Sequence, residues 1–343
     1  MTTFPRRRRL NRRQQHPSNR STLYHGLSNV AIAMACLLLA TTSPTCSAFI
    51  EQDRSPTTML QTLGSPTATV PLKWTDFHKH TSNADPPVLF IHGLLGNKRN
   101  FASVASSLGA QLDKPRRIFG VDLRNHGESE WHESMSYTDM AQDVLDFLDE
   151  QNLDQVVLVG HSMGGKVAQA LSLIEPSRVA GLVVLDIAPV EYCRHNDPHW
   201  KAVVDILHAM QDATEKAVEE SGGTATKQDL DKKLREAIPD PALRGFVLTN
   251  YGRDGWKIPL PTIIHQLEQL AGFDVSHAAT SEQYDGDVFF IQGGQSKFVR
   301  HAYLDKIASF FPNHMLTTIR GAGHWVHAGP SILLLLLLLM STV

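Results

Sequence analysis

Residues 156–165 read Val-Val-Leu-Val-Gly-His-Ser-Met-Gly-Gly, and this stretch decides how the rest of the chain is interpreted. Its first four residues are all apolar, as in a strand that is buried on both faces. Gly160, Ser162 and Gly164 then form a Gly-x-Ser-x-Gly pattern, and helix-forming residues continue to about Leu173. A strand, a sharp turn and a helix are the context in which this pattern presents a nucleophilic serine. Ser162 is therefore the candidate nucleophile.

Short apolar runs separated by helical segments flank this stretch on both sides. They cover residues 87–91, 117–121, 155–159, 181–185, 288–291 and 315–319. Between them, residues 137–151 have apolar side chains at the spacing of an amphipathic helix. Uniformly apolar strands that alternate with helices indicate a mostly parallel central sheet with helices on both faces. Together with the serine motif, this pattern predicts an α/β class protein with the α/β-hydrolase fold over residues 71–343.

Residues from about 190 to 280 interrupt this alternation. They form helical segments separated by Gly and Pro, with charged runs such as Asp229 to Arg235. An insertion between the later strands of a sheet is a common position for a lid over an active site. We therefore expect a helical lid insertion at about 190–280.

The candidate nucleophile needs a general base that accepts a proton near pH 7, and this requirement points to histidine. In this fold the serine, the acid and the histidine follow one another along the chain. His324 lies in a Gly-Ala-Gly-His loop after the last apolar run, where glycines allow the loop to curl over the sheet edge. His324 is the predicted base, and His327 is an alternative that suits packing better.

The predicted acid is in an unusual place. The usual position follows residues 288–291, where the sequence reads Gln-Gly-Gly-Gln-Ser without a carboxylate. Asp186 instead ends the apolar run after the serine, at the sheet end where the serine also emerges. A carboxylate there can hold the imidazole tautomer through the Nδ1 proton. Asp285 and Asp287 are the alternatives, and capping of the next turn is the non-catalytic interpretation of Asp186.

A tetrahedral intermediate needs two main-chain N–H donors directed at the developing oxyanion. Met163, directly after the serine, is one predicted donor. The loop at residues 92–96, His-Gly-Leu-Leu-Gly, offers Leu94 as the other. The predicted substrate-binding residues adjoin these donors and are His92, Gly93 and His161.

Composition and charge exclude some partners. The formal net charge is −3 at pH 7, yet seven Arg and no acidic residue fall within residues 1–48, so the remainder is markedly acidic. Nucleic acid is therefore an unsuitable partner, because its binding depends on clustered Lys and Arg. Cys193, His195 and His199 are close in sequence, but no Cys pair or carboxylate-rich run completes a metal site. We expect neither a metal nor another cofactor.

Residues 1–48 are predicted to be a targeting leader. An Arg-rich start precedes an apolar run at 30–40 and small residues before Phe49. The run is shorter than the roughly 20 residues of a membrane span, but it suits a signal peptide cleaved after Ala48. Residues 49–70, rich in Ser, Thr and Pro, then form a transit-like or linker segment. We expect entry into the secretory pathway or a plastid, with a mitochondrion or an uncleaved anchor as alternatives. No stable membrane span is expected after the leader is removed.

Five motifs together resemble one family. They are His-Gly-Leu-Leu-Gly at 92–96, Asp-x-Arg-Asn-His-Gly at 122–127, Gly-His-Ser-Met-Gly-Gly-Lys at 160–166, Asp-Ile-Ala-Pro-Val at 186–190 and Gly-Ala-Gly-His-Trp-Val-His at 321–327. The likeness covers about residues 70–329. It is to the alpha/beta hydrolases, in particular the group of alpha/beta hydrolase domain-containing protein 11 and its bacterial esterase relatives. The resemblance implies an acid in the Asp-Ile-Ala-Pro segment, which supports Asp186, and it favours the mitochondrial alternative.

The chain departs from this family in two places. Residues 331–343 contain a Leu run between Ile332 and Met340, where family members have an acidic closing helix. This replacement is expected to expose a face of the sheet, and the run itself suits a buried helix, an aggregation-prone end or an error in the gene model. The stretch from Thr214 to Gln228 is longer and more polar than in the family, which predicts an enlarged lid loop.

The three residues Ser162, Asp186 and His324 predict a serine hydrolase that cleaves a carboxylic ester or thioester through an acyl-serine intermediate. The expected partner is a small-molecule acyl substrate. One alternative is other hydrolase-fold chemistry, such as C–C bond hydrolysis or perhydrolysis. Another is a non-catalytic role in ligand binding. Haloalkane dehalogenases and epoxide hydrolases are disfavoured, because their nucleophile is Asp.

Overall fold

The computed structural model describes residues 69–79, 85–192, 197–329 and 331–340. All of them belong to one compact unit of the chain. The predicted leader at 1–48, and residues 49–68 of the transit-like segment, lie outside the described residues.

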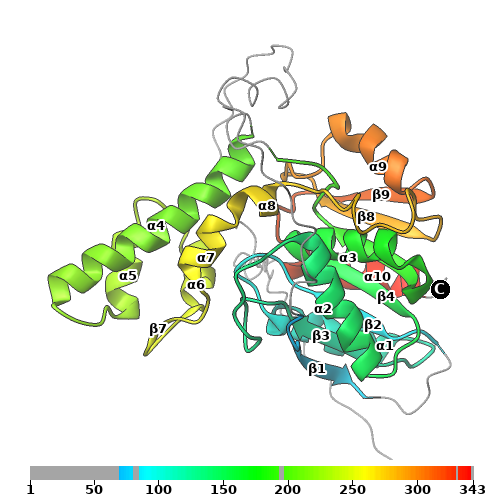
Figure 1. Cartoon of the computed structure of the whole chain (residues 1–343), viewed down its shortest axis with the longest axis horizontal. Helices are drawn as coiled ribbons and strands as arrows, with labels where there is room; N and C mark the ends of the chain where they lie inside the picture. The colour runs from blue at the N-terminus through cyan, green and yellow to red at the C-terminus, as the bar shows by residue number, and fades with distance from the viewer. Residues whose placement is uncertain (1–68, 80–84, 193–196, 330, 341–343) are drawn as a thin grey trace, which may run out of the picture. The chain divides into compact units, whose positions relative to one another are not determined.

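Seven strands form the central sheet, in the order β1, β3, β2, β4, β5, β8 and β9 (Figure 1). Their bounds are β1 Lys73–His78, β2 Val88–Ile91, β3 Ile118–Asp122, β4 Val156–His161, β5 Val179–Leu185, β8 Val288–Gly293 and β9 His314–Ile319. β1 is antiparallel to β3, and all other neighbours are parallel. The predicted mostly parallel sheet is therefore confirmed.

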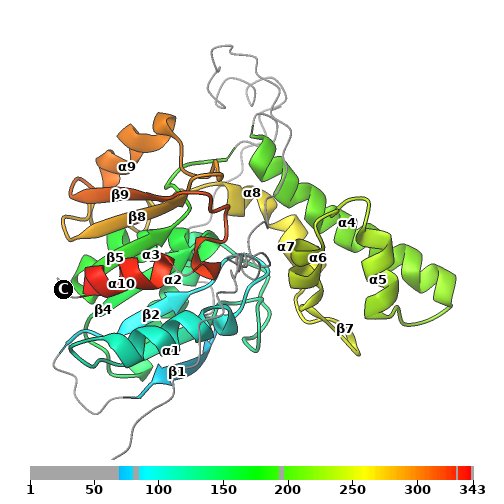
Figure 2. The same cartoon turned by 180° about the vertical axis from the view of Figure 1, so that it is seen from behind.

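Helices cover both faces of this sheet. α2 Tyr137–Glu150, α3 Met163–Ile174 and α9 Leu304–Phe310 pack on one face, and α1 Ala102–Gln111 and α10 Ser331–Met340 share the other (Figure 2). Short 3-10 helices lie at Lys98–Phe101, Pro176–Arg178, His301–Tyr303 and Val326–Ala328. Successive side chains of a strand point to opposite faces. Along β4, Leu158 accordingly packs in the core beside α2 and α3, whereas Val157 and Val159 pack in the core beside α1.

A set of helices lies between β5 and β8 in the chain. It contains α4 Pro198–Ser221, α5 Lys227–Leu234, α6 Pro241–Leu248, α7 Leu260–His265 and α8 Leu267–Ala271, with a hairpin of β6 Tyr251–Gly252 and β7 Gly255–Trp256. Side chains from this insertion, such as Trp200 and Leu207, belong to the same core as α2 and α3. The insertion is therefore packed onto the sheet domain rather than separate from it.

The prediction of an enlarged loop at 214–228 is wrong for residues 214–221, which continue α4. Ala213 and Ala217 are buried on the inner side of the helix, and the charged residues between them face outward. Gly222, with a φ of 65°, ends the helix in the left-handed conformation that glycine adopts most easily. The polar composition of this stretch reflects the solvent side of a helix.

The Leu-rich end forms the helix α10. Ile332, Leu336 and Met340 recur every fourth residue and are buried in the core beside α1, whereas Leu334 is 62% exposed and Leu338 is 58% exposed. The expectation that this replacement uncovers the sheet is therefore wrong for the part beside α1. Within the described ranges, no helix has the length and apolar character needed to span a membrane.

Glycines allow α3 to lie against the ends of β2 and β4. A Cβ atom on Gly164 would lie 2.4 Å from the carbonyl oxygens of Ile91 and His92. One on Gly160 would lie 2.3 Å from Gly164 O. Both distances are shorter than van der Waals contact, and the opposing atoms are backbone atoms that cannot rotate away. The two glycines of the serine motif are therefore required by packing.

We expect the Gly164→Ala variant to lose about 3 kcal/mol or more of its free energy of unfolding, because the new methyl group overlaps main-chain atoms. Gly245, in α6, is the matched control because a Cβ there meets nothing within 4 Å. Gly245→Ala should gain about 0.5–1 kcal/mol from its higher helix propensity. Urea unfolding measures both values, and equal effects of the two substitutions would contradict the packing argument.

Candidate active site

Ser162 occupies the sharp turn between β4 and α3. Its backbone has φ 53° and ψ −119°, a region that costs a non-glycine residue about 1–3 kcal/mol. Main-chain hydrogen bonds hold the turn: Ser162 N–H donates to Leu185 O at 3.0 Å, and Lys166 N–H donates to Ser162 O at 3.1 Å. The strained turn therefore presents the serine hydroxyl at the carboxyl end of the sheet.

His324 lies between Ser162 and Asp186. It is in the loop that connects β9 to the last 3-10 helix. Its Nε2 is 2.9 Å from Ser162 Oγ, and its Nδ1 is 2.7 Å from Asp186 Oδ2. If the ring donates its Nδ1 proton to the carboxylate, Nε2 is the acceptor for the serine O–H. The structure thus brings the three predicted residues together in hydrogen-bonding order.

Asp186 directly follows β5, with a φ of 55°, and it is fully buried. Its second oxygen, Oδ1, accepts a hydrogen bond from Gly293 N–H at 2.9 Å. Gly293 ends β8, and the residues directly after it, 294–296, are Gly-Gln-Ser without a carboxylate. The main chain at the end of β8 therefore binds a carboxylate that the neighbouring strand provides.

The alternative acid and base residues are placed differently. Asp285 and Asp287 are exposed and precede β8, so they lie at the edge where the parallel strands begin. His327 lines the cavity next to Ser162, but its ring packs on His161 with centroids 4.5 Å apart. Burial lowers the pKa of His327 to about 4. Of the candidate residues, His324 is therefore the one that contacts Ser162 Oγ, and Asp186 is the one that contacts His324 Nδ1.

Leu94 and Met163 both line the cavity beside Ser162. Within the described chain, neither main-chain N–H donates a hydrogen bond to another protein group. Met163 is the first residue of α3, and the first N–H groups of a helix have no helical acceptor. Leu94 belongs to a turn that is closed by Gly96 N–H and Gly93 O at 2.9 Å. Both predicted oxyanion donors are thus available to a ligand.

His92 and His161 are bound to the main chain. His92 Nδ1 lies 2.8 Å from Gly93 O, and His92 Nε2 accepts a hydrogen bond from Leu123 N–H at 3.0 Å. His161 Nε2 lies 2.9 Å from His324 O. Burial lowers the pKa of both histidines, which favours neutral rings. These two residues and Gly93 line the cavity, but both ring nitrogens of His92 already bind the protein itself.

The polar loop after β3 supports the turn that contains Leu94. His126 Nε2 accepts a hydrogen bond from Leu95 N–H at 3.2 Å, and His126 Nδ1 lies 3.0 Å from Arg124 O. Burial lowers the pKa of His126 to about 3, so the ring is neutral. Arg124 is itself held by Asp143, with two hydrogen bonds of 2.6 and 2.8 Å. The loop therefore orders the rim of the sheet.

Lys166 is a functional candidate that sequence reasoning missed. It lies one turn after Ser162, is 1% exposed and lines the cavity. Its ammonium group donates to Val190 O at 2.8 Å, Ala271 O at 2.9 Å and Gly272 O at 2.6 Å. Burial lowers its pKa, and three carbonyl acceptors for three N–H groups oppose that effect. Val190 lies at the start of the insertion, and Ala271 and Gly272 lie near its end. The hydrogen bonds from Lys166 therefore link both ends of the insertion to α3.

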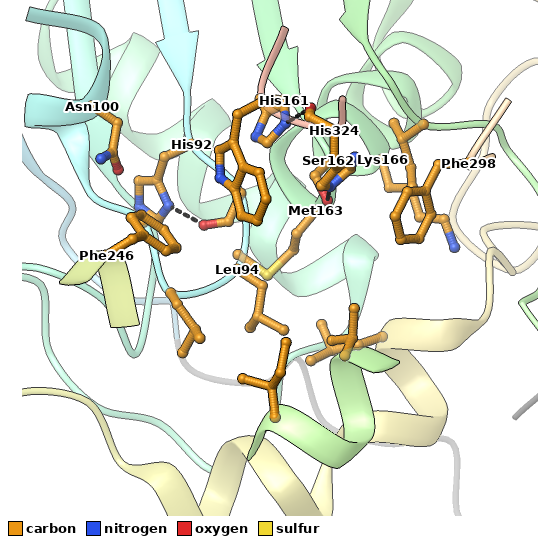
Figure 3. A pocket seen from close by; sticks show the side chains of 18 of the residues that line it. His92, Leu94, Asn100, His161, Ser162, Met163, Lys166, Phe246, Phe298 and His324 are labelled. Carbon is orange, nitrogen blue, oxygen red and sulfur yellow. Dashed lines mark hydrogen bonds between the residues drawn. The ribbon is translucent and has the colours of Figure 1, made fainter. Parts of the chain in front are cut away.

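The cavity above Ser162 contains about 960 Å³ of open space, its mouth included. Its walls are mainly apolar side chains from the sheet domain and the insertion: Leu94, Met163, Ile187, Trp200, Val203, Leu207, Leu243, Phe246 and Phe298. Figure 3 shows Ser162 and Met163 between Lys166 and Phe298 at one end and His92, Asn100 and Phe246 at the other. The serine is therefore reached through a mostly apolar pocket.

The predicted absence of a metal concerns residues near the start of α4. Cys193 and His195 lie outside the described residues, and the ring of His199 packs near Phe298 with centroids 6.1 Å apart. Over the described ranges, no group of three His, Cys, Asp or Glu side chains is arranged to hold a metal ion.

Known proteins are similar to this chain over most of its length. The sequence profile of the alpha/beta hydrolase fold matches residues 86–329. The sn-1-specific diacylglycerol lipase ABHD11 of Mus musculus is 35% identical over 247 residues, which are 71% of this chain and 76% of that protein. Esterase YbfF of Escherichia coli strain K12 is 34% identical over 243 residues, which are 71% of this chain and 87% of that protein.

A solved structure has the same architecture. A marine microorganism esterase matches with a TM-score of 0.68 and 30% sequence identity, and the match covers 79% of this chain and 100% of that one. The profile match spans well over half of the chain, and it includes Ser162, Asp186 and His324 and the strands that precede them. The chain belongs to the alpha/beta hydrolase family.

Proposed function

We propose that this protein is a serine hydrolase that cleaves carboxylic esters through an acyl-Ser162 intermediate. The observation that carries the proposal is the hydrogen-bonded series Ser162, His324 and Asp186, with contacts of 2.9 and 2.7 Å. Two relatives named as an esterase and a diacylglycerol lipase support ester hydrolysis over the other chemistries of the fold.

In the first half of the reaction, Ser162 Oγ attacks the acyl carbonyl carbon while His324 Nε2 accepts the hydroxyl proton. The imidazolium that forms is stabilised by the Asp186 carboxylate at Nδ1. The carbonyl oxygen becomes an oxyanion and accepts hydrogen bonds from the N–H groups of Leu94 and Met163. The tetrahedral intermediate then collapses, His324 gives its proton to the leaving alcohol, and the acyl group stays on Ser162.

In the second half, a water molecule replaces the alcohol. His324 takes a proton from the water, whose oxygen attacks the acyl carbon, and the same two amides bind the oxyanion. Collapse returns the proton to Ser162 Oγ and releases a carboxylic acid. A thioester follows the same steps with a thiol as leaving group, so thioester cleavage is part of the proposal.

The apolar walls of the cavity support an acyl group of hydrocarbon character. Burying such a group stabilises the complex by about 25 cal/mol for each Å² of apolar surface removed from water. Trp200, Leu207 and Phe298 line the cavity and offer surface of this kind. We therefore propose that esters with apolar acyl chains are better substrates than acetyl esters.

The Ser162→Ala variant tests the nucleophile. The wild-type protein should hydrolyse p-nitrophenyl esters and react covalently with a fluorophosphonate probe. Ser162→Ala should do neither, because Ser162 Oγ is the hydroxyl that contacts His324 Nε2 among the residues that the structure describes. The exposed Ser177 provides the control, and Ser177→Ala should react as the wild type does. Labelling of Ser162→Ala at the wild-type rate would reject this nucleophile, whereas a wild-type protein without turnover would favour a non-catalytic role.

Buried neutral histidines around the site make stability depend on pH. The pKa of His126 is about 3 in the folded state, compared with about 6.5 in an unfolded chain. As the pH falls from 6.5 toward 3, the unfolded chain binds a proton that the folded protein does not bind. The contribution of His126 to the free energy of unfolding is therefore complete above pH 6.5 and decreases below it.

We expect the free energy of unfolding of the wild type to decrease between pH 6.5 and pH 4, by up to about 1.4 kcal/mol per pH unit for each such histidine. For the His126→Gln variant, the free energy of unfolding should change less steeply with pH, by about 1.4 kcal/mol per pH unit, which is the contribution of one proton. Urea unfolding at a series of pH values measures both slopes. Parallel slopes for the two proteins would show that His126 is not held neutral.

A further inference from the structure

The main chain of Leu95 is bound from both sides by side chains of different segments. Its N–H donates to His126 Nε2 at 3.2 Å, and its carbonyl oxygen accepts a hydrogen bond from Asn250 Nδ2 at 2.8 Å. His126 comes from the loop after β3, and Asn250 comes from the insertion, between α6 and β6. Leu95 immediately follows Leu94, whose N–H is a proposed oxyanion donor.

The conformation of this turn needs such support. Leu95 has a φ of 61°, and a left-handed conformation costs a non-glycine residue about 1–2 kcal/mol. With Gly96 N–H bound to Gly93 O, Leu95 is the third residue of a turn of the type II kind, a position that usually requires glycine. Rotation of the central peptide would relieve the strain, but it would break the bond from Leu95 N–H to His126. His126 therefore selects the strained turn over the relaxed one, and Asn250 holds the peptide that follows it through Leu95 O.

Asn250 is well placed for this role. It is 4% exposed, and its own carbonyl oxygen accepts from Lys257 N–H at 2.7 Å, while its N–H donates to Val247 O at 3.1 Å. The position of its side chain is thus set by the fold of the insertion. Without the Asn250 donor, Leu95 O would be a buried carbonyl lacking this partner, a loss of about 1–3 kcal/mol.

We propose that Asn250 is a positioning residue that keeps the Leu94 N–H in place for the oxyanion. The site is then catalytically active only while the insertion packs against the Leu95 turn. The inference rests on the proposed function. A second contact near the same place supports it: Phe246 of α6 packs on Trp325, next to His324, with ring centroids 5.8 Å apart. The insertion thus touches both the oxyanion turn and the histidine loop.

The role predicts a separation of kinetic constants. The oxyanion exists in the transition state but not in the bound substrate, so a displaced donor lowers kcat more than it raises KM. Complete loss of one oxyanion donor lowers kcat by about 10²–10³-fold. A donor that is displaced but still present should cost less, about 10–100-fold.

The experiment uses the full-length protein with Asn250→Ala, which removes the donor, and Asn250→Asp, which keeps the shape and replaces the donor by an acceptor. Tyr251→Phe is the matched control. Tyr251 is the next residue, is 3% exposed, and its hydroxyl donates to Ala225 O at 2.9 Å within the insertion, away from the turn. Each variant is assayed for kcat and KM with a p-nitrophenyl ester, for inhibition by an alkyl boronic acid, and for thermal unfolding.

Both Asn250 variants should have kcat lowered about 10–100-fold with KM changed less than about 3-fold. The boronic acid forms a tetrahedral adduct with Ser162, so its inhibition constant should rise by a similar factor to the loss in kcat. Tyr251→Phe should keep the wild-type kcat even if it unfolds at a lower temperature.

Three results would overturn the inference while leaving the proposed function intact. They are a wild-type kcat in a folded Asn250→Asp variant, an equal loss of kcat in Tyr251→Phe, and a rise in KM alone. A wild-type protein that neither turns over esters nor binds the boronic acid would reject the proposed function, and this inference with it.

Discussion

The hydrogen bonds that join Asp186, His324 and Ser162 depend on how the parallel strands end. Ser162 follows β4, Asp186 follows the adjacent strand β5, and His324 follows β9 two strands further. Because these strands are parallel, their carboxyl ends meet at one edge of the sheet, and residues distant in sequence come within 3 Å there. The order and parallel direction of these strands are thus the constraint on which the site depends.

The same edge concentrates backbone strain. Leu95, Ser162 and Asp186 are all non-glycine residues with positive φ, and each costs about 1–3 kcal/mol. Main-chain hydrogen bonds and buried histidines hold them, and the glycines of the serine motif allow the backbones to approach. The folding free energy of the rest of the domain therefore maintains a site that would relax if it were isolated. Lys166 and Asn250 extend this support to the insertion.

Most of the strands, and the three residues Ser162, Asp186 and His324 that the structure joins by hydrogen bonds, could be predicted from sequence because each carries a local signal. An apolar run followed by Gly-x-Ser-x-Gly fixed the interpretation around Ser162, and Asp186 followed from the missing carboxylate after β8. The antiparallel strand β1, with its mixed polar composition, carries no such signal. The partners of Lys166 and Asn250 are main-chain carbonyls, and a carbonyl is the same in every residue, so no sequence pattern marks it. Such contacts follow only from the tertiary fold.

The most direct test of this account is the kcat of the Asp186→Asn variant, because that change keeps the shape of the side chain and removes its charge. We predict a loss of about 10⁴-fold, since the amide favours the wrong imidazole tautomer, with thermal unfolding close to that of the wild type. Asp287→Asn, on the opposite sheet edge, should keep the wild-type kcat. An Asp186→Asn protein whose kcat stays within about 10-fold of the wild-type value would contradict the role assigned to this carboxylate.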